Sequence, residues 1–227
     1  MNDPLKQPII TEAFACVQRA LLENGGEFPP NELQSFRRRS QHIERVTLWC
    51  KRLLKNETGL FADPALVYYS ALFHDAGYNQ QGKPHEELGA DIFLRFAHEH
   101  MFPDALSLAV ADIILHHSCK ESIYNPNTSI EQILVIEADL LDEEGIFGIA
   151  VDCMAFAKIN SHTGEYYGSL LEYLSQYAGE ILHYSPMVTP YAANCWQKKQ
   201  EKIRLFLRDL EDDLFLNCDW IDKLLVD

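Results

Sequence analysis

The chain has 227 residues, of which 47% are hydrophobic, and this is enough to build a sizeable core in one large domain, with or without an appended helical segment. Its formal net charge of −15 argues against nonspecific binding to nucleic acid and against binding to an anionic membrane surface. A phosphate-bearing substrate would therefore need a local cation in its binding site.

The cysteines and the first residues of the chain indicate the cellular compartment of the protein. No Cys-x-x-Cys spacing occurs among Cys16, Cys50, Cys119, Cys153, Cys195 and Cys218. No basic segment followed by an apolar one opens the chain, and no apolar run approaches the length of a membrane span. We therefore expect a cytoplasmic protein with reduced thiols and without membrane or nucleic-acid partners.

Apolar residues at helical spacing predict the first two helices. The first covers residues 11–23 and ends at Gly25-Gly26. Asn31 and Gln34 resemble a capping box, which predicts that the second helix begins there and continues to about residue 55.

His42 lies on the flank of the apolar stripe of this second helix, at helical spacing from Val46, Trp49 and Leu53. A lone histidine in such a position is more often structural than a ligand. The three arginines at positions 37–39 precede it, and a short run of charges is typical of a solvated face.

The next helix ends in a His-Asp pair. Asp63 followed by Pro64 predicts an N-cap and a first-turn proline, and Gly77 predicts the stop. Nearly every residue between them is apolar or aromatic, which predicts a helix buried on most sides. His74 and Asp75 then lie at its carboxyl end, where the helix dipole and burial both disfavour a carboxylate. A bound cation would remove both objections, although a capping Asp beside a core histidine is the simpler interpretation of the pair alone.

Three further helices carry polar residues of interest. Two are predicted at residues 85–100 and 104–117, and the second ends in His116-His117-Ser118. Thr128 and Glu131 form a capping box for a helix from Ile130 to about Glu144. In that helix Asp139 is flanked by apolar residues and needs a partner, whereas we expect Asp142 to be solvated.

The remaining chain predicts helices at about residues 149–159, 165–184 and 190–216. No alternating strand pattern, glycine-rich phosphate loop or fixed-period repeat is present. The predicted fold class is therefore all-α, as a single domain over residues 1–227.

Four polar residues share one property: each lies on, or at the end of, an apolar helical face. They are His42, His74, Asp75 and Asp139. Two imidazoles and two carboxylates suit a divalent ion such as Mn²⁺, Fe²⁺, Co²⁺, Zn²⁺, Ni²⁺ or Mg²⁺, and leave room for water. His85, His116 and His117 add a second imidazole set near the same helix ends.

The same residues and their neighbours resemble the HD-domain superfamily of metal-dependent phosphohydrolases. The matching segments, in family order, are QHIERV, ALFHDAGY, HEELGAD, IILHHS and IEADLLDEEGIFGIA. The resemblance covers about residues 30–160, and the helical tail at about 161–227 is similar to that of small stand-alone bacterial HD proteins, which include nucleotide pyrophosphohydrolases. The chain departs from the family at Glu137, where Asp is usual, and in its Arg-rich segment before His42; both departures fall where substrate specificity is expected to be set.

The resemblance implies a compact multi-helix HD bundle with a C-terminal helical extension. It implies that the metal ligands are His42, His74, Asp75 and Asp139. One ion is expected and two are left open, because His85 and His117 could bind a second ion, hydrogen-bond a phosphate or donate a proton. Asp75 could bridge metal and nucleophile. Arg45 is a further catalytic candidate that could neutralise phosphate, and a surface salt bridge is the alternative for it.

The expected function is hydrolysis of a nucleotide or another small phosphate ester by a metal-activated water. Two alternatives stay open: a non-catalytic regulatory module that binds a metal or a nucleotide, and a di-iron oxygenase. The intact ligand set favours the enzyme. A homodimer is left open.

Overall fold

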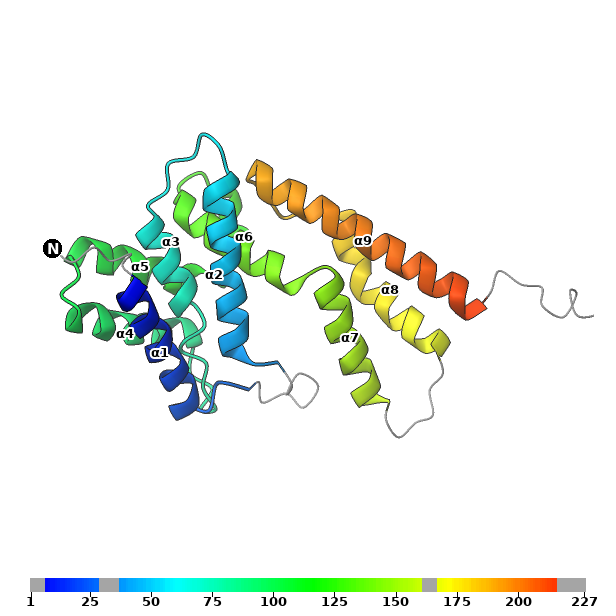
Figure 1. The fold of residues 1–227 in the computed structure, drawn as a ribbon, viewed down its shortest axis with the longest axis horizontal. Helices are drawn as coiled ribbons and strands as arrows, with labels where there is room; N and C mark the ends of the chain where they lie inside the picture. The colour runs from blue at the N-terminus through cyan, green and yellow to red at the C-terminus, as the bar shows by residue number, and fades with distance from the viewer. Residues whose placement is uncertain (1–6, 29–36, 161–166, 216–227) are drawn as a thin grey trace, which may run out of the picture. The chain divides into compact units, whose positions relative to one another are not determined.

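The computed structural model describes residues 7–28, 37–160 and 167–215. Within these ranges it contains α-helices and one short 3-10 helix, η2, but no strand, so the predicted all-α class is confirmed. The elements are α1 (Gln7–Glu23), α2 (Arg39–Asn56), α3 (Pro64–Phe73), α4 (His85–Glu99), α5 (Asp104–His116), η2 (Lys120–Tyr124), α6 (Ile130–Glu143), α7 (Ile146–Ile159), α8 (Tyr167–His183) and α9 (Pro190–Phe215) (Figure 1).

The chain divides into two compact units. The first comprises residues 1–142 and 187–192, and the second comprises residues 143–186 and 193–227. Sequence reasoning placed the end of the HD core near residue 160, whereas the structure groups α7 with the second unit. The reason is a small separate core in which Ile149 of α7 packs with Leu174 of α8 and Ile203 of α9.

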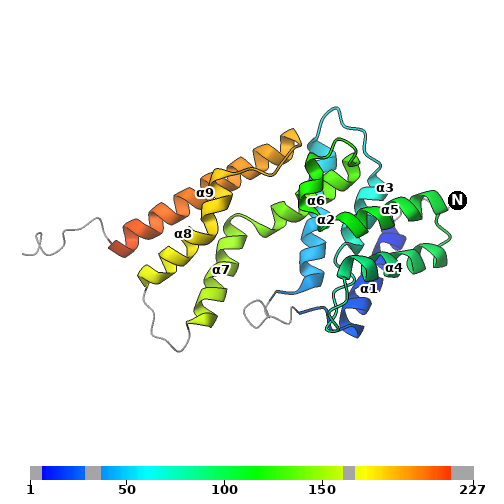
Figure 2. The same ribbon diagram turned by 180° about the vertical axis from the view of Figure 1, so that it is seen from behind.

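Helix α3 is the centre of the first unit, and it contacts α1, α2, α4 and α5. Its Tyr69 and Phe73 are fully buried and pack against Phe93 and Phe96 of α4. Figure 2 shows α4 and α5 side by side in this unit. Burying one such aromatic side chain contributes about 1.5–3 kcal/mol, so α3 and the residues that follow it are held firmly.

The ends of α3 agree with the prediction. Asp63 is the N-cap, and its carboxylate accepts a hydrogen bond from the Ala65 backbone N–H at 2.8 Å. Pro64 occupies the first turn, where its missing N–H costs nothing. The helix ends at Phe73, and His74 and Asp75 follow directly, both buried.

The predicted start of α2 is wrong, whereas α6 begins at Ile130 as predicted but with a different cap. Residues 37 and 38 are not helical and α2 begins at Arg39, while Asn31 and Gln34 lie outside the described residues. The cap of α6 is Ser129, whose Oγ accepts from the Gln132 N–H at 3.2 Å. Glu131 instead accepts from the Asp63 backbone N–H. The glutamate of the predicted capping box therefore bonds to a distant part of the chain and not to the start of its own helix.

The first turn of α9 is held by two buried carboxylates. Glu137 of α6 accepts from the backbone N–H groups of Val188 and Thr189 at 2.6 and 2.8 Å, and from the Thr189 hydroxyl. Glu57, at the end of α2, accepts from the N–H groups of Tyr191 and Ala192 at 2.8 and 3.0 Å. These bonds satisfy the donors that a helix start leaves without partners.

We predict that Glu137→Ala lowers the free energy of unfolding by about 3 kcal/mol, because it removes charge-assisted bonds and leaves buried donors unpaired. Urea and thermal unfolding measure this. Glu44→Ala, at an exposed position on α2, is the control and should change stability by less than about 0.5 kcal/mol. Equal effects in the two variants would contradict the role given to Glu137.

Candidate metal centre

His42 enters the site from α2, where its helix packs Ile43 and Val46 into the core. The His42 Nδ1 lies 2.8 Å from Asp142 Oδ2. Its Nε2 points to the opposite side, 3.1 Å from Asp139 Oδ1 and 3.5 Å from Asp75 Oδ2. The imidazole is therefore tied at one nitrogen and presents the other to two carboxylates.

His74 is anchored in the same way at the end of α3. Its Nδ1 donates to the Ala71 carbonyl oxygen at 2.7 Å, since the residue is still in helical conformation and its side chain reaches back one turn. Its Nε2 lies 3.3 Å from His42 Nε2 and 3.5 Å from Asp75 Oδ2. His42, His74 and Asp75 thus place their ligand atoms within 4.8 Å of one another.

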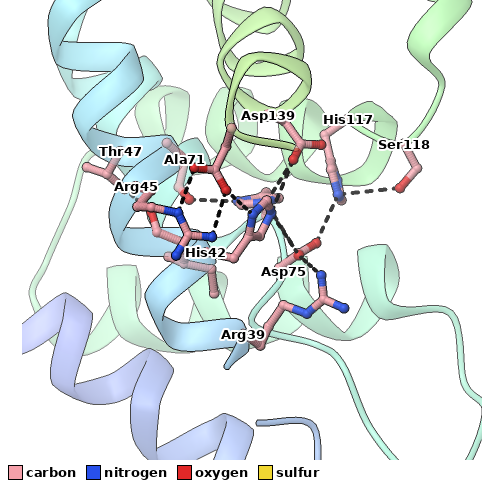
Figure 3. A network of polar contacts seen from close by, with 12 residues as sticks. Arg39, His42, Arg45, Thr47, Ala71, Asp75, His117, Ser118 and Asp139 are labelled. Atoms are coloured by element: carbon pink, nitrogen blue, oxygen red, sulfur yellow. Dashed lines mark hydrogen bonds and ion pairs between the residues drawn. The ribbon is translucent and has the colours of Figure 1, made fainter. Parts of the chain in front are cut away.

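A second group of imidazoles faces the other oxygen of Asp75. His117, at the end of α5, donates from Nδ1 to the Ile114 carbonyl at 2.7 Å, and its Nε2 lies 3.4 Å from Asp75 Oδ1. His85, at the start of α4, has its Nε2 3.6 Å from the same oxygen and its Nδ1 3.3 Å from Glu86. Asp75 therefore lies between two histidine sets, one on each oxygen. Figure 3 shows it between His42 of the first set and His117 of the second.

All four histidines share one design. Each has its Nδ1 held by an outer acceptor and its Nε2 directed towards Asp75. A histidine that binds a metal through one nitrogen usually donates from the other to a carboxylate or carbonyl, which fixes the tautomer and the ring plane. The donor set of imidazole nitrogens and carboxylate oxygens therefore fits a divalent ion, and Asp139 Oδ1 adds a further ligand atom beside His42.

The charges of the site follow from burial and pairing. Burial opposes ionisation of Asp75, but His74 and Arg39 outweigh it and hold the pKa of that carboxyl well below its usual range. The pKa of Asp139 is likewise lowered, by its bond to His42 and by Lys120. Burial lowers the pKa of His74 to about 4 and also lowers that of His85. At neutral pH the site therefore holds carboxylates and two neutral imidazoles.

Two cations that sequence reasoning did not select reach these carboxylates. The Arg39 Nη1 donates to Asp75 Oδ2 at 2.8 Å, although the run at 37–39 was interpreted as a solvated face. The Lys120 ammonium pairs with Asp139 Oδ2. Both side chains retain some solvent exposure, 18% for Arg39 and 34% for Lys120, so they can be reached from solvent.

Asp142 is the clearest correction. We expected it to be solvated, but it is buried, and it bonds His42 and, through both oxygens, Arg45 at 2.8 and 2.9 Å. Arg45 therefore forms a salt bridge, but with a buried carboxylate behind His42 and not at the surface as the alternative for it had it. Asp142 lies three residues after Asp139, and helical residues at that spacing share a face, so this signal was present in the sequence.

Other expected positions differ more simply. Glu137 caps α9 and bonds away from the histidines. His116 is exposed and donates to the Asp112 carbonyl, so it does not join His117 at the site. Ser118, which was not selected, has its Oγ 3.4 Å from both His85 Nε2 and His117 Nε2.

Comparison with known proteins identifies the arrangement. Residues 39–144 match the family model of the HD domain, and all the site residues described above fall within the matched range. The chain contains an HD domain. No curated protein sequence matches the chain significantly.

Solved structures share the fold of this HD domain and its helical extension. An HD-superfamily hydrolase from Bacillus thuringiensis has 21% identity and a TM-score of 0.61, over 92% of this chain and 98% of that one. A "predicted HD superfamily hydrolase" from an uncultured Thermotogales bacterium has 16% identity and a TM-score of 0.59, over 90% and 92%. Bacillus subtilis YpgQ in complex with ADP has 22% identity and a TM-score of 0.55, over 90% and 94%. The chain thus has the fold of HD-superfamily hydrolases.

We predict that Asp142→Asn weakens metal affinity by about 10- to 100-fold, because the outer acceptor of His42 loses its charge. Titration with Mn²⁺, followed calorimetrically, measures this. Glu143→Gln, at the next and exposed position, is the matched control and should bind the ion as the wild type does. Unchanged affinity in Asp142→Asn would contradict the anchoring role.

We also predict a pH dependence of metal binding. Burial alone would lower the pKa of His42, but Asp139 and Asp142 outweigh it and raise the pKa to about 9. An ion needs the neutral imidazole, so below pH 9 a proton must leave His42, and affinity should weaken by about tenfold for each pH unit. Calorimetry in buffers of different ionisation heat should show about one proton released per ion at pH 7.5. Constant affinity between pH 6.5 and 8.5 would contradict this.

Proposed function

We propose that this protein is a metal-dependent phosphohydrolase that acts on a nucleotide or another small phosphate ester. The observation that carries the proposal is the set of four anchored histidines whose Nε2 atoms converge on Asp75, with two cations beside the carboxylates. A site built only for structure would not need accessible cations beside its ligand atoms.

The first histidine set is the proposed metal site. Its ligands are His42, His74, Asp75 and Asp139, as the family resemblance implies, and the ligand atoms of the first three lie within 4.8 Å of one another. A divalent ion bound there would acidify a water and polarise a phosphoryl oxygen. The buried imidazoles are anchored before the ion arrives, so little reorganisation is needed.

The second set, His85 and His117, faces the substrate in this proposal. Burial keeps His85 neutral, and Glu86 beside its Nδ1 favours the tautomer whose Nε2 has a lone pair. That nitrogen can therefore accept the proton of the attacking water. This assignment replaces proton donation, since a neutral imidazole in this tautomer presents no proton to the site.

The cations account for phosphate binding in an acidic protein. Arg39 and Lys120 lie on different carboxylates of the proposed metal site, Asp75 and Asp139. An arginine can bind two phosphate oxygens at once, and a lysine adds a point charge. Two cations suit a substrate with more than one phosphate, and the ADP complex of the structurally similar YpgQ supports a nucleotide.

We predict that His85→Ala and His117→Ala keep about one ion per chain but lose hydrolysis by about a hundredfold or more. Asp139→Asn should instead lose the ion. Elemental analysis and phosphate release from a panel of nucleotides and phosphomonoesters, with Mn²⁺, Co²⁺ or Mg²⁺, measure both. His116→Ala is the matched control because its imidazole points away from the site, and it should behave as the wild type.

The outcomes separate the alternatives. Two ions in the wild type, falling to one in His85→Ala, would show that the second set binds a metal. Metal-loaded wild type that hydrolyses no member of the panel would contradict the enzyme and favour a non-catalytic module.

A further inference from the structure

Tyr78, in the loop after α3, contacts two groups of the site with one aromatic ring. The guanidinium carbon of Arg39 lies 3.8 Å from the ring centroid. The imidazole of His85 stacks on the ring with centroids 4.2 Å apart and planes 26° from parallel. Cation–π and stacking contacts of this kind fix both distance and orientation.

The two groups that rest on Tyr78 are the ones that approach Asp75 from different sides. Arg39 bonds Asp75 Oδ2, and His85 Nε2 lies 3.6 Å from Oδ1. They come from separate elements, α2 and α4. Arg39 and His85 therefore pack against the same Tyr78 ring, which links the position of one to that of the other.

The backbone at Tyr78 is held from both sides. A Cβ atom on Gly26 would overlap the Tyr78 carbonyl oxygen, and a Cβ atom on Gly77 would overlap the backbone of His85 and Gly89. The Tyr78 N–H also donates to the Asp75 carbonyl at 3.2 Å. This close backbone packing leaves the ring little freedom to shift along the chain direction, so it can act as a rigid spacer.

We propose that Tyr78 is a positioning residue that sets the places of Arg39 and His85 around Asp75, and through them the place of a substrate phosphate. The proposal rests on the phosphohydrolase function. Tyr78 acts through these two groups, which its ring contacts. Its face, rather than its hydroxyl, carries the role.

The first experiment compares Tyr78→Phe, which keeps the aromatic ring, with Tyr78→Leu, which keeps an apolar side chain but has no aromatic ring. Tyr78→Leu should retain the metal, lose kcat by tenfold or more, and bind inorganic phosphate at least threefold more weakly by calorimetry. Tyr78→Phe should stay within about twofold of the wild type in both measurements. Tyr68→Leu, at a half-buried tyrosine on α3 outside the site, is the control and should keep kcat.

Equal losses in the Phe and Leu variants would overturn the proposal, because the hydroxyl would then be the active part. Wild-type behaviour of Tyr78→Leu would overturn it as well. Should the Leu variant not fold, as judged by circular dichroism, Tyr78→Met replaces it with the same expectations.

A second experiment does not depend on activity. The melting temperatures of Tyr78→Leu, Arg39→Met and the double variant form a cycle in metal-free protein. If the ring positions Arg39, the double variant should lose less than the sum of the single losses; additive losses would overturn the proposal. Wild type that neither hydrolyses nor binds phosphate would show failure of the proposed function, and the cycle would still decide the role of Tyr78.

Discussion

An ionised carboxylate buried at the carbonyl end of a helix is the constraint around which this HD domain is built. Asp75 is 4% exposed, and an unpaired charge in such a place costs several kcal/mol. The protein offsets that cost with Arg39 and with histidines on both oxygens. These partners come from α2 and the end of α5, and His85 adds an imidazole from the start of α4, so the three helices meet at Asp75.

The outer hydrogen bonds matter as much as the residues that face the centre. The Ala71 and Ile114 carbonyls belong to the last turns of α3 and α5, so these helices use groups left free at their ends to orient His74 and His117. His42 lies within a helix, where its carbonyl neighbours are already used, and a side chain, Asp142, has to do the same work. Position in a helix thus explains which acceptor each imidazole uses.

Much of this was predictable because its signals are local. Asp63-Pro64 marks the start of α3, and the isolated polar residues His42 and Asp139 in apolar stripes indicate a shared site. Asp142 and Arg39 were wrongly predicted to be solvated because their partners, His42 and Asp75, lie 100 and 36 positions away in the sequence. Arg39 and Asp142 each lie three residues from a selected residue of the same helix, His42 and Asp139, which indicates that the helical neighbours of a candidate ligand should be considered with it. Lys120 is in η2, outside the helices that carry the selected residues.

The capping of α9 has a consequence for how the HD domain can be separated from the rest of the chain. The matched range, residues 39–144, includes Glu57 and Glu137 but not the peptide N–H groups at 188–192 that they bind. A fragment cut at residue 144 would leave the buried carboxylates of Glu57 and Glu137 without these donors. Glu137 lies only two residues from Asp139, so the loss would fall close to the site. The boundary of the family motif is therefore not a boundary of folding, and shuffling of this module between proteins would have to carry the start of α9 along with it.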